Sequence, residues 1–86
     1  MYYIYVLYSV KIKKRYVGLT TDLRRRFAEH NRGDSNFTNR GKPWKLLYYE
    51  AFVDKKDAER EEIFLKMGKG RERLDTLLLT TMTKIK

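Results

Sequence analysis

The chain has no cysteine, a single proline and few acidic residues in its first half. The absence of cysteine excludes disulfide bonds and thiolate metal sites. No stretch approaches the roughly 20 apolar residues that a membrane-spanning helix requires. The apolar N-terminus lacks the basic start and the small-residue cleavage site of a signal peptide. We therefore expect a soluble, cytoplasmic protein without a membrane partner, whose residues 1–86 form one domain with its core over about 2–78.

Positive charge is concentrated in the first half of the chain. Residues 1–49 carry eleven Lys and Arg against three acids, whereas residues 50–86 carry nine against eight. Such segregation indicates a polyanionic partner, and nucleic acid is favoured over an anionic membrane because no basic amphipathic helix is evident. A surface that is charged only for solubility is the alternative.

Three segments rich in aromatic and β-branched residues predict strands, at 2–10, 15–20 and 44–52. The first two are joined by a short turn, which is typical of an antiparallel hairpin. If Val10 faces Arg15, Tyr5 and Tyr16 lie on the same face of this hairpin. A slip of one residue would place the two tyrosines on opposite faces.

A first helix is predicted over 23–32, directly after the hairpin. The residues that favour its two ends are the N-cap candidates Thr20, Thr21 and Asp22 and the C-terminal Gly33. Leu23 and Phe27 form an apolar i,i+4 pair, and Arg26 and His30 form a second pair about 60° further around the helix. Arg26 and His30 are therefore expected at the edge of the buried stripe.

The C-terminal third is predicted to contain two helices and a frayed tail. Asp54 caps the first of these helices, which runs to about residue 67 and ends before Gly68 and Gly70. The second is short and directs three leucines to the core, Leu74, Leu77 and Leu78. Residues 80–86 are expected to fray. With a ten-residue loop at 34–43, the order β-β-α-β-α-α predicts an α+β domain, a small three-stranded antiparallel sheet flanked by helices.

One carboxylate in the predicted helix that Asp54 caps is placed unusually. Glu62 lies between Ala58 and Leu65 on the helical wheel, so it faces a partly apolar surface. A carboxylate in such a position requires a function or a partner. An ion pair with Lys66 at i,i+4 is the structural alternative.

Five ordered matches indicate a known family. They are Tyr3-Ile4-Tyr5, Tyr16-Val17-Gly18, the arginine-bearing helix at 22–31, the pairs Phe37-Thr38 and Pro43-Trp44, and the stretch 58–66. In these matches the chain resembles the GIY-YIG nuclease superfamily, in particular its small stand-alone branch, which is similar to the nuclease domain of the excision-repair C proteins. The chain departs from the pattern at Tyr3, where the family name has glycine, and at Leu19, where some repair-type members carry lysine.

The resemblance implies hydrolysis of DNA phosphodiester bonds with one divalent metal, Mg²⁺ or Mn²⁺. It makes Tyr5 the general base or the group that orients the attacking water, and Arg26 the brace of the phosphate. Tyr16 and His30 would bond to the water or phosphate and hold Tyr5. Glu62 would be the only protein ligand of the metal. Because a phenol has a pKa of about 10, base function would need nearby cations.

Each of these residues also has a structural interpretation. Tyr5 and Tyr16 could be ordinary hairpin tyrosines with hydroxyls at the rim of the core. Arg26 could be surface charge, and His30 could be a cation stabilised by the helix C-terminus. These alternatives stay open at the level of the sequence.

The remaining cations of the first half are candidates for phosphate contacts. The predicted nucleic-acid-binding residues are Arg24, Arg25, Arg32, Thr38, Arg40, Lys42 and Lys45. Nothing resembles a base-reading element, so contacts should fall on the backbone, with DNA favoured over RNA. A branched substrate or a partner protein would supply specificity. The hypothesis is a metal-dependent endonuclease acting in DNA repair or recombination; the alternatives are a non-catalytic nucleic-acid-binding module and a general scaffold domain.

Overall fold

The protein is built around one antiparallel sheet of three strands. The computed structural model describes residues 1–33 and 38–85. β1 (Tyr2–Ser9) is the central strand, with β2 (Lys14–Thr20) on one side and β3 (Trp44–Phe52) on the other. β2 and β3 are therefore both edge strands, and side chains near β2 can reach around the rim of the sheet.

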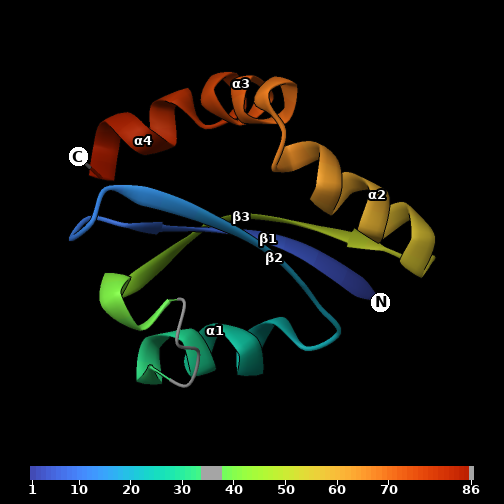
Figure 1. The fold of residues 1–86 in the computed structure, drawn as a ribbon, viewed down its shortest axis with the longest axis horizontal. Helices are drawn as coiled ribbons and strands as arrows, with labels where there is room; N and C mark the ends of the chain where they lie inside the picture. Colours follow the sequence, from blue (N-terminus) through green and yellow to red (C-terminus); the bar gives the residue numbers. More distant parts are fainter. Residues whose placement is uncertain (34–37, 86) are drawn as a thin grey trace.

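Helices lie on both faces of this sheet (Figure 1). α1 (Leu23–Arg32) covers one face together with the short 3-10 turn η1 (Asn39–Gly41). α2 (Lys55–Leu65), α3 (Gly68–Leu77) and α4 (Leu79–Ile85) form a layer on the other face. The α+β class predicted from the sequence is confirmed.

The central strand is buried on both sides because both faces of the sheet are covered. Successive side chains of a strand point to opposite faces, so β1 contributes to two apolar cores. The larger core, under α2 and α3, contains Ile4, Val6, Val17, Ala58, Leu65, Leu74 and Leu78. The smaller core, under α1, contains Tyr5, Leu7 and Trp44. Tyr5 consequently points towards α1.

The hairpin register differs from the predicted one by two residues. Tyr5 faces Gly18 and Leu7 faces Tyr16, so the predicted pairing of Val10 with Arg15 is wrong. The turn has the expected length but lies one residue earlier, between Ser9 and Lys14, and Lys13 adopts a positive φ of 55° directly before β2 begins. A shift of two residues preserves the face of every side chain. Tyr5 and Tyr16 therefore share one face, as predicted.

The boundaries of α1 are those expected from its flanking residues. The side chain of Asp22 accepts a hydrogen bond from the backbone N–H of Arg25 at 3.1 Å, which caps the N-terminus. Gly33 ends the helix with φ of 83°, the left-handed conformation that glycine adopts without strain. Asp22 and Gly33 thus determine where α1 begins and ends, and with it which helical face packs on the sheet. This sets the positions of Arg26 and His30.

The C-terminal third differs from the prediction in four respects. α2 ends at Leu65 instead of 67, and Gly70 lies inside α3 instead of ending a helix. A Cβ on Gly70 would come closer to the backbone of Phe64 than van der Waals contact permits, so glycine allows α3 to pack against the end of α2. Leu77 is exposed, whereas Leu74 and Leu78 reach the core as predicted.

The fourth difference is the tail, which forms α4 up to Ile85 in place of the predicted frayed segment. Met82 of α4 packs against the larger core, and this packing explains a helix that propensity alone does not predict. None of the described helices has the length and apolar character of a membrane span.

The predicted loop at 34–43 is only partly described. Its first four residues, 34–37, lie outside the described residues. The remainder contains η1, and the Lys42–Pro43 peptide bond is cis. This segment runs beside the C-terminal end of α1, where it contributes Thr38 to the interior.

Candidate active site

Two tyrosines, a histidine and an arginine gather on the face of the sheet that α1 covers. The ring centroids of Tyr5 and Tyr16 lie 6.2 Å apart, and that of His30 lies 5.7 Å from Tyr5 and 4.9 Å from Tyr16. Arg26 is close enough to the Tyr5 hydroxyl to lower the pKa of that group. The structure thus brings four of the five predicted catalytic and metal-binding residues into one cluster.

His30 is fully buried and hydrogen-bonded through both ring nitrogens. Nε2 lies 2.8 Å from the hydroxyl of Tyr5, and Nδ1 lies 2.7 Å from Oγ1 of Thr38. Burial and, secondly, the charge of Arg26 lower the pKa of His30 to about 4, so the imidazole is neutral at pH 7. The edge position predicted for His30 is therefore too exposed, and the proposed helix-terminal cation does not form.

The tautomer of His30 sets the direction of its two hydrogen bonds. With the proton on Nδ1, the Tyr5 O–H donates to Nε2 and Nδ1–H donates to Oγ1 of Thr38; with the proton on Nε2, both bonds reverse. In either tautomer His30 holds the Tyr5 hydroxyl in place.

A second layer of hydrogen bonds holds Thr38 in place. Nε1–H of Trp44 donates to the backbone carbonyl of Thr38 at 2.7 Å. The side chain of Asn31 bonds to both backbone groups of Trp44, at 2.5 Å and 3.2 Å. Thr38 is among the predicted nucleic-acid contacts, but it is fully buried and its hydroxyl meets His30. It therefore acts on the site from the interior, as a support for His30.

Tyr5 is a neutral phenol in this environment. Burial, followed by the neighbouring Tyr16, raises the pKa of Tyr5 to about 12, while Arg26 acts in the opposite direction. Arg26 itself is held by Glu29 at 3.0 Å, and this hydrogen bond is the main reason why the pKa of Arg26 is raised. Glu29 thus positions Arg26, a role that the sequence does not indicate.

Glu62 approaches the cluster from the opposite side of the sheet. It lies on α2, whose Ala58 and Leu65 pack in the larger core, yet its charge contributes to the raised pKa of Tyr5. This charge is the smallest of the causes that act on Tyr5. Glu62 is three-quarters buried and pairs with Lys66 at 3.2 Å, so the ion pair considered from the sequence is present. Both interpretations of Glu62 are compatible with this position.

The donor set near Tyr5 fits a hard divalent cation with few protein ligands. No group of three or more His, Cys, Asp or Glu side chains that could hold a metal occurs among residues 1–33 and 38–85. Mg²⁺ prefers oxygen ligands and retains several waters, so one carboxylate plus phosphate oxygens can hold it. Glu62 is a carboxylate of this kind, provided that Lys66 releases it.

Gly18 has a steric role that the sequence pattern understates. It faces Tyr5 across the hairpin, and a Cβ at this position would clash with the Tyr5 hydroxyl oxygen and lie 2.5 Å from Cζ. Glycine thus leaves the space through which the Tyr5 ring extends over β2. The correct register would reveal this, because it places the smallest residue opposite the buried tyrosine.

Substituting Gly18→Ala is expected to destabilise the protein by about 1 to 3 kcal/mol, because the buried Tyr5 ring has to move and the core becomes overpacked. Urea unfolding measures the effect. Gly68→Ala is the matched control, since a Cβ there meets nothing within 4 Å and should cause no overpacking. Equal midpoints for Gly18→Ala and the wild type would contradict the placement of Tyr5 over β2.

The predicted phosphate-contacting cations do not all lie beside the cluster. Exposed positions on the same side of the sheet belong to Arg24, Arg25 and Arg32 of α1 and to Arg40 and Lys42 of the η1 segment. Lys45 of β3, in contrast, pairs with Tyr8 of β1. Tyr8 points away from Tyr5, so Lys45 projects from the other face of the sheet.

Comparison with known proteins identifies the class to which this fold and cluster belong. The GIY-YIG catalytic domain matches residues 1–74, and the chain therefore belongs to the GIY-YIG family, as the two tripeptides indicate. This is a nuclease-type family.

The similar relatives are UPF0213 proteins. One from Streptococcus pyogenes serotype M3 is 44% identical over 70 residues, which are 80% of this chain and 75% of that protein. One from Streptococcus pneumoniae serotype 4 is 38% identical over 76 residues, which are 87% of this chain and 76% of that protein. The solution NMR structure of the UPF0213 protein BH0048 from Bacillus halodurans is 33% identical, covers 90% of this chain and 85% of its own, and has a TM-score of 0.56.

Proposed function

We propose that the protein is a divalent-metal-dependent endonuclease that hydrolyses DNA phosphodiester bonds, with branched or damaged DNA as the substrate in repair or recombination. The supporting observation is the juxtaposition of Tyr5, Tyr16, Arg26 and His30 with a carboxylate that arrives from another layer of the fold. Membership of a nuclease-type family supports the same reaction class.

Glu62 would hold Mg²⁺ or Mn²⁺, with water and phosphate oxygens as the other ligands. When bound, the ion stabilises negative charge on the leaving oxygen. Lys66 neutralises Glu62 in the described structure and would have to release it for metal binding. Arg26, oriented by Glu29, would donate hydrogen bonds to the phosphate as its charge increases in the transition state.

The environment of Tyr5 favours one of its two possible roles. A phenol with a pKa of about 12 is neutral at pH 7, so it is a poor general base in the described structure. A neutral hydroxyl that is hydrogen-bonded to His30, in either direction, still has an oxygen lone pair, which can accept a hydrogen from the attacking water. We therefore assign Tyr5 to orienting this water, and Tyr16 and His30 to holding Tyr5 and the phosphate in position.

Cleavage of a DNA panel tests the proposal. Linear, flapped, forked and four-way DNA, with an RNA of the linear sequence, are incubated with the protein in Mg²⁺, in Mn²⁺ and in EDTA. We expect cleavage of at least one branched DNA in either metal and none in EDTA, because the leaving oxygen requires the ion. Denaturing gels resolve the products. Cleavage that persists in EDTA would contradict metal dependence.

A non-catalytic nucleic-acid-binding module is the second candidate function. The observation in its favour is the ion pair of Glu62 with Lys66, which gives the carboxylate a structural partner. Binding of the same panel without cleavage in either metal would support the module and overturn the nuclease.

A further inference from the structure

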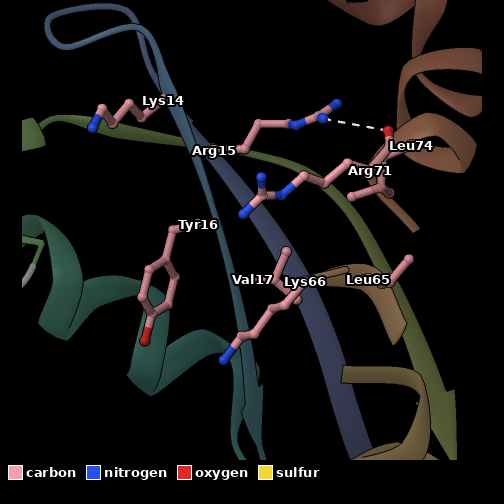
Figure 2. Close-up of a pocket in the computed structure, with 8 residues that line it drawn as sticks. All are labelled: Lys14, Arg15, Tyr16, Val17, Leu65, Lys66, Arg71 and Leu74. Atoms are coloured by element: carbon pink, nitrogen blue, oxygen red, sulfur yellow. Dashed lines mark hydrogen bonds between the residues drawn. The ribbon is translucent and has the colours of Figure 1, made fainter. Parts of the chain in front are cut away.

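A basic concavity lies directly beside the candidate active site. It is a pocket of about 590 Å³ between β2 and the layer formed by α2 and α3. Its lining residues are Lys14, Arg15, Tyr16, Val17, Leu65, Lys66, Arg71 and Leu74 (Figure 2). Half of them are cations, and none is acidic. Tyr16 belongs to both the pocket and the catalytic cluster, so the two are continuous around the edge of the sheet.

The four cations differ in how they are engaged. Arg15 pairs with Asp75 at 2.9 Å and donates to the backbone carbonyl of Arg71 at 3.4 Å, which ties β2 to α3 (Figure 2). Lys66 is paired with Glu62. Lys14 and Arg71 are exposed, and neither forms an ion pair with any described residue. Lys14 lies on the face of β2 that carries Tyr16 and points away from Arg71, which approaches β2 from α3 (Figure 2). These two charges, one on each side of the edge strand, remain available to a ligand.

We infer that this pocket binds backbone phosphates of the nucleic acid at the edge of β2, which Lys14 flanks on the face of Tyr16 and Arg71 flanks on the face of α3. The inference rests on the proposed nucleic-acid function and names a part of its binding surface, with Lys14 and Arg71 as the phosphate contacts. The cations predicted from the sequence lie on α1, on η1 and in β3, so none of them lines this pocket. The strand would therefore pass over the edge of β2, with the scissile phosphate near Tyr16.

Three features of the pocket favour binding of a phosphate over occupation by water alone. Its cations come from β2, from the end of α2 and from α3, so the tertiary fold, not a local run of charge, assembles them. Apolar side chains, Val17, Leu65 and Leu74, form its walls and exclude water from part of it. Cations that line a concavity with apolar walls attract a polyanion more strongly than the same charges on a convex surface, because such walls focus the electric field.

The test measures binding of a fluorescein-labelled forked DNA in EDTA by anisotropy at several salt concentrations. The double variant Lys14→Gln/Arg71→Gln should bind more weakly than the wild type. Its slope of log affinity against log salt should be smaller by about 1.4 to 1.8, the loss of two phosphate contacts. Lys14→Arg/Arg71→Lys, which keeps both charges, should bind like the wild type.

Lys55→Gln/Lys56→Gln is the matched control for charge. It removes two cations from the first turn of α2, and α2 is about 15 Å long, so these positions lie far from Lys66. This control should retain the wild-type salt slope, and near-identical thermal unfolding of all four proteins would show that the fold is intact.

The outcomes distinguish a failure of the pocket proposal from a failure of the proposed function. A wild-type salt slope in Lys14→Gln/Arg71→Gln, or an equal loss in the Lys55→Gln/Lys56→Gln control, overturns the pocket but leaves the nuclease proposal untouched. Absence of any binding by the wild-type protein to the forked or four-way DNA overturns both.

Discussion

Replacement of Glu62 by glutamine is expected to lower DNA cleavage by at least about 100-fold while DNA binding is retained or strengthened. Substitutions of residues that merely support a metal ligand commonly lower affinity or activity 10- to 100-fold, so loss of the single protein ligand should exceed that range. Binding should not weaken, because the substitution removes a negative charge from a surface that faces a polyanion. Cleavage rates in Mg²⁺ and anisotropy in EDTA give the two quantities.

The matched control for this prediction is Glu59→Gln. Glu59 is exposed on the same helix, and its replacement by glutamine changes the charge by the same amount. Glu59 is not among the groups that shift the pKa of Tyr5. It should cleave at the wild-type rate. If Glu62→Gln also cleaves at that rate, Glu62 has only the structural role that its contact with Lys66 indicates.

The second large effect concerns a pair of carboxyl groups outside the site. Two carboxyl groups lie close together, Glu50 of β3 and Glu61 of α2. Hydrogen bonding with Glu50, with burial as the next cause, raises the pKa of Glu61 to about 7. One oxygen of Glu50 is buried and has no hydrogen-bond partner among the described residues. Nη1 of Arg73 lies 3.8 Å from Oε2 of Glu61, and its charge offsets the increase in the pKa of Glu61 only in part.

Glu61→Gln is expected to stabilise the protein by about 2 to 3 kcal/mol at pH 8.5 and to have little effect at pH 4.5. The pKa of Glu61 is raised in the fold, so its contribution to stability is present below about 4.5 and lost as the pH rises through 7. A glutamine amide donates to Glu50 at every pH and removes this loss. Urea unfolding at a series of pH values measures the difference.

The comparison has to be made between variants because His30 acts in the opposite direction. Its pKa is about 4 in the fold, so the unfolded chain takes up the proton first and stability falls as the pH drops from about 6.5 to 4. Glu59→Gln again serves as the control of equal charge and should follow the wild-type curve. A Glu61→Gln curve parallel to that of the wild type would refute the raised pKa of Glu61.

Local signals predict those parts of the fold that depend on neighbouring residues. Asp22 and Gly33 define α1, and the β-rich composition of Trp44–Phe52 defines β3 within its observed bounds. The predicted register is displaced because the turn depends on Lys13 in a left-handed conformation, which lysine does not signal. The sequence does not predict α4 because its stability comes from Met82 in the core, not from helix propensity.

The candidate site follows a similar division. The motif spacing identifies the residues that gather at Tyr5, and the face shared by Tyr5 and Tyr16 is unaffected by the error in register. The supports of His30 are not predictable in this way, because Thr38 meets His30 through a loop whose path does not follow from local propensity. The Glu50–Glu61 pair joins two elements of the tertiary fold, and such a contact has no periodic signature.

The position of Glu62 on the far side of the edge strand has a consequence for local unfolding. Under the proposed roles, the sheet and α1 contain every group except the metal ligand, and α2 supplies that ligand by docking. Partial opening of a helical layer costs less free energy than global unfolding. Each such excursion of α2 would leave the tyrosine cluster in place and remove the carboxylate. The hydrogen-exchange protection of α2 amides thus sets an upper limit on the fraction of molecules that are competent for catalysis.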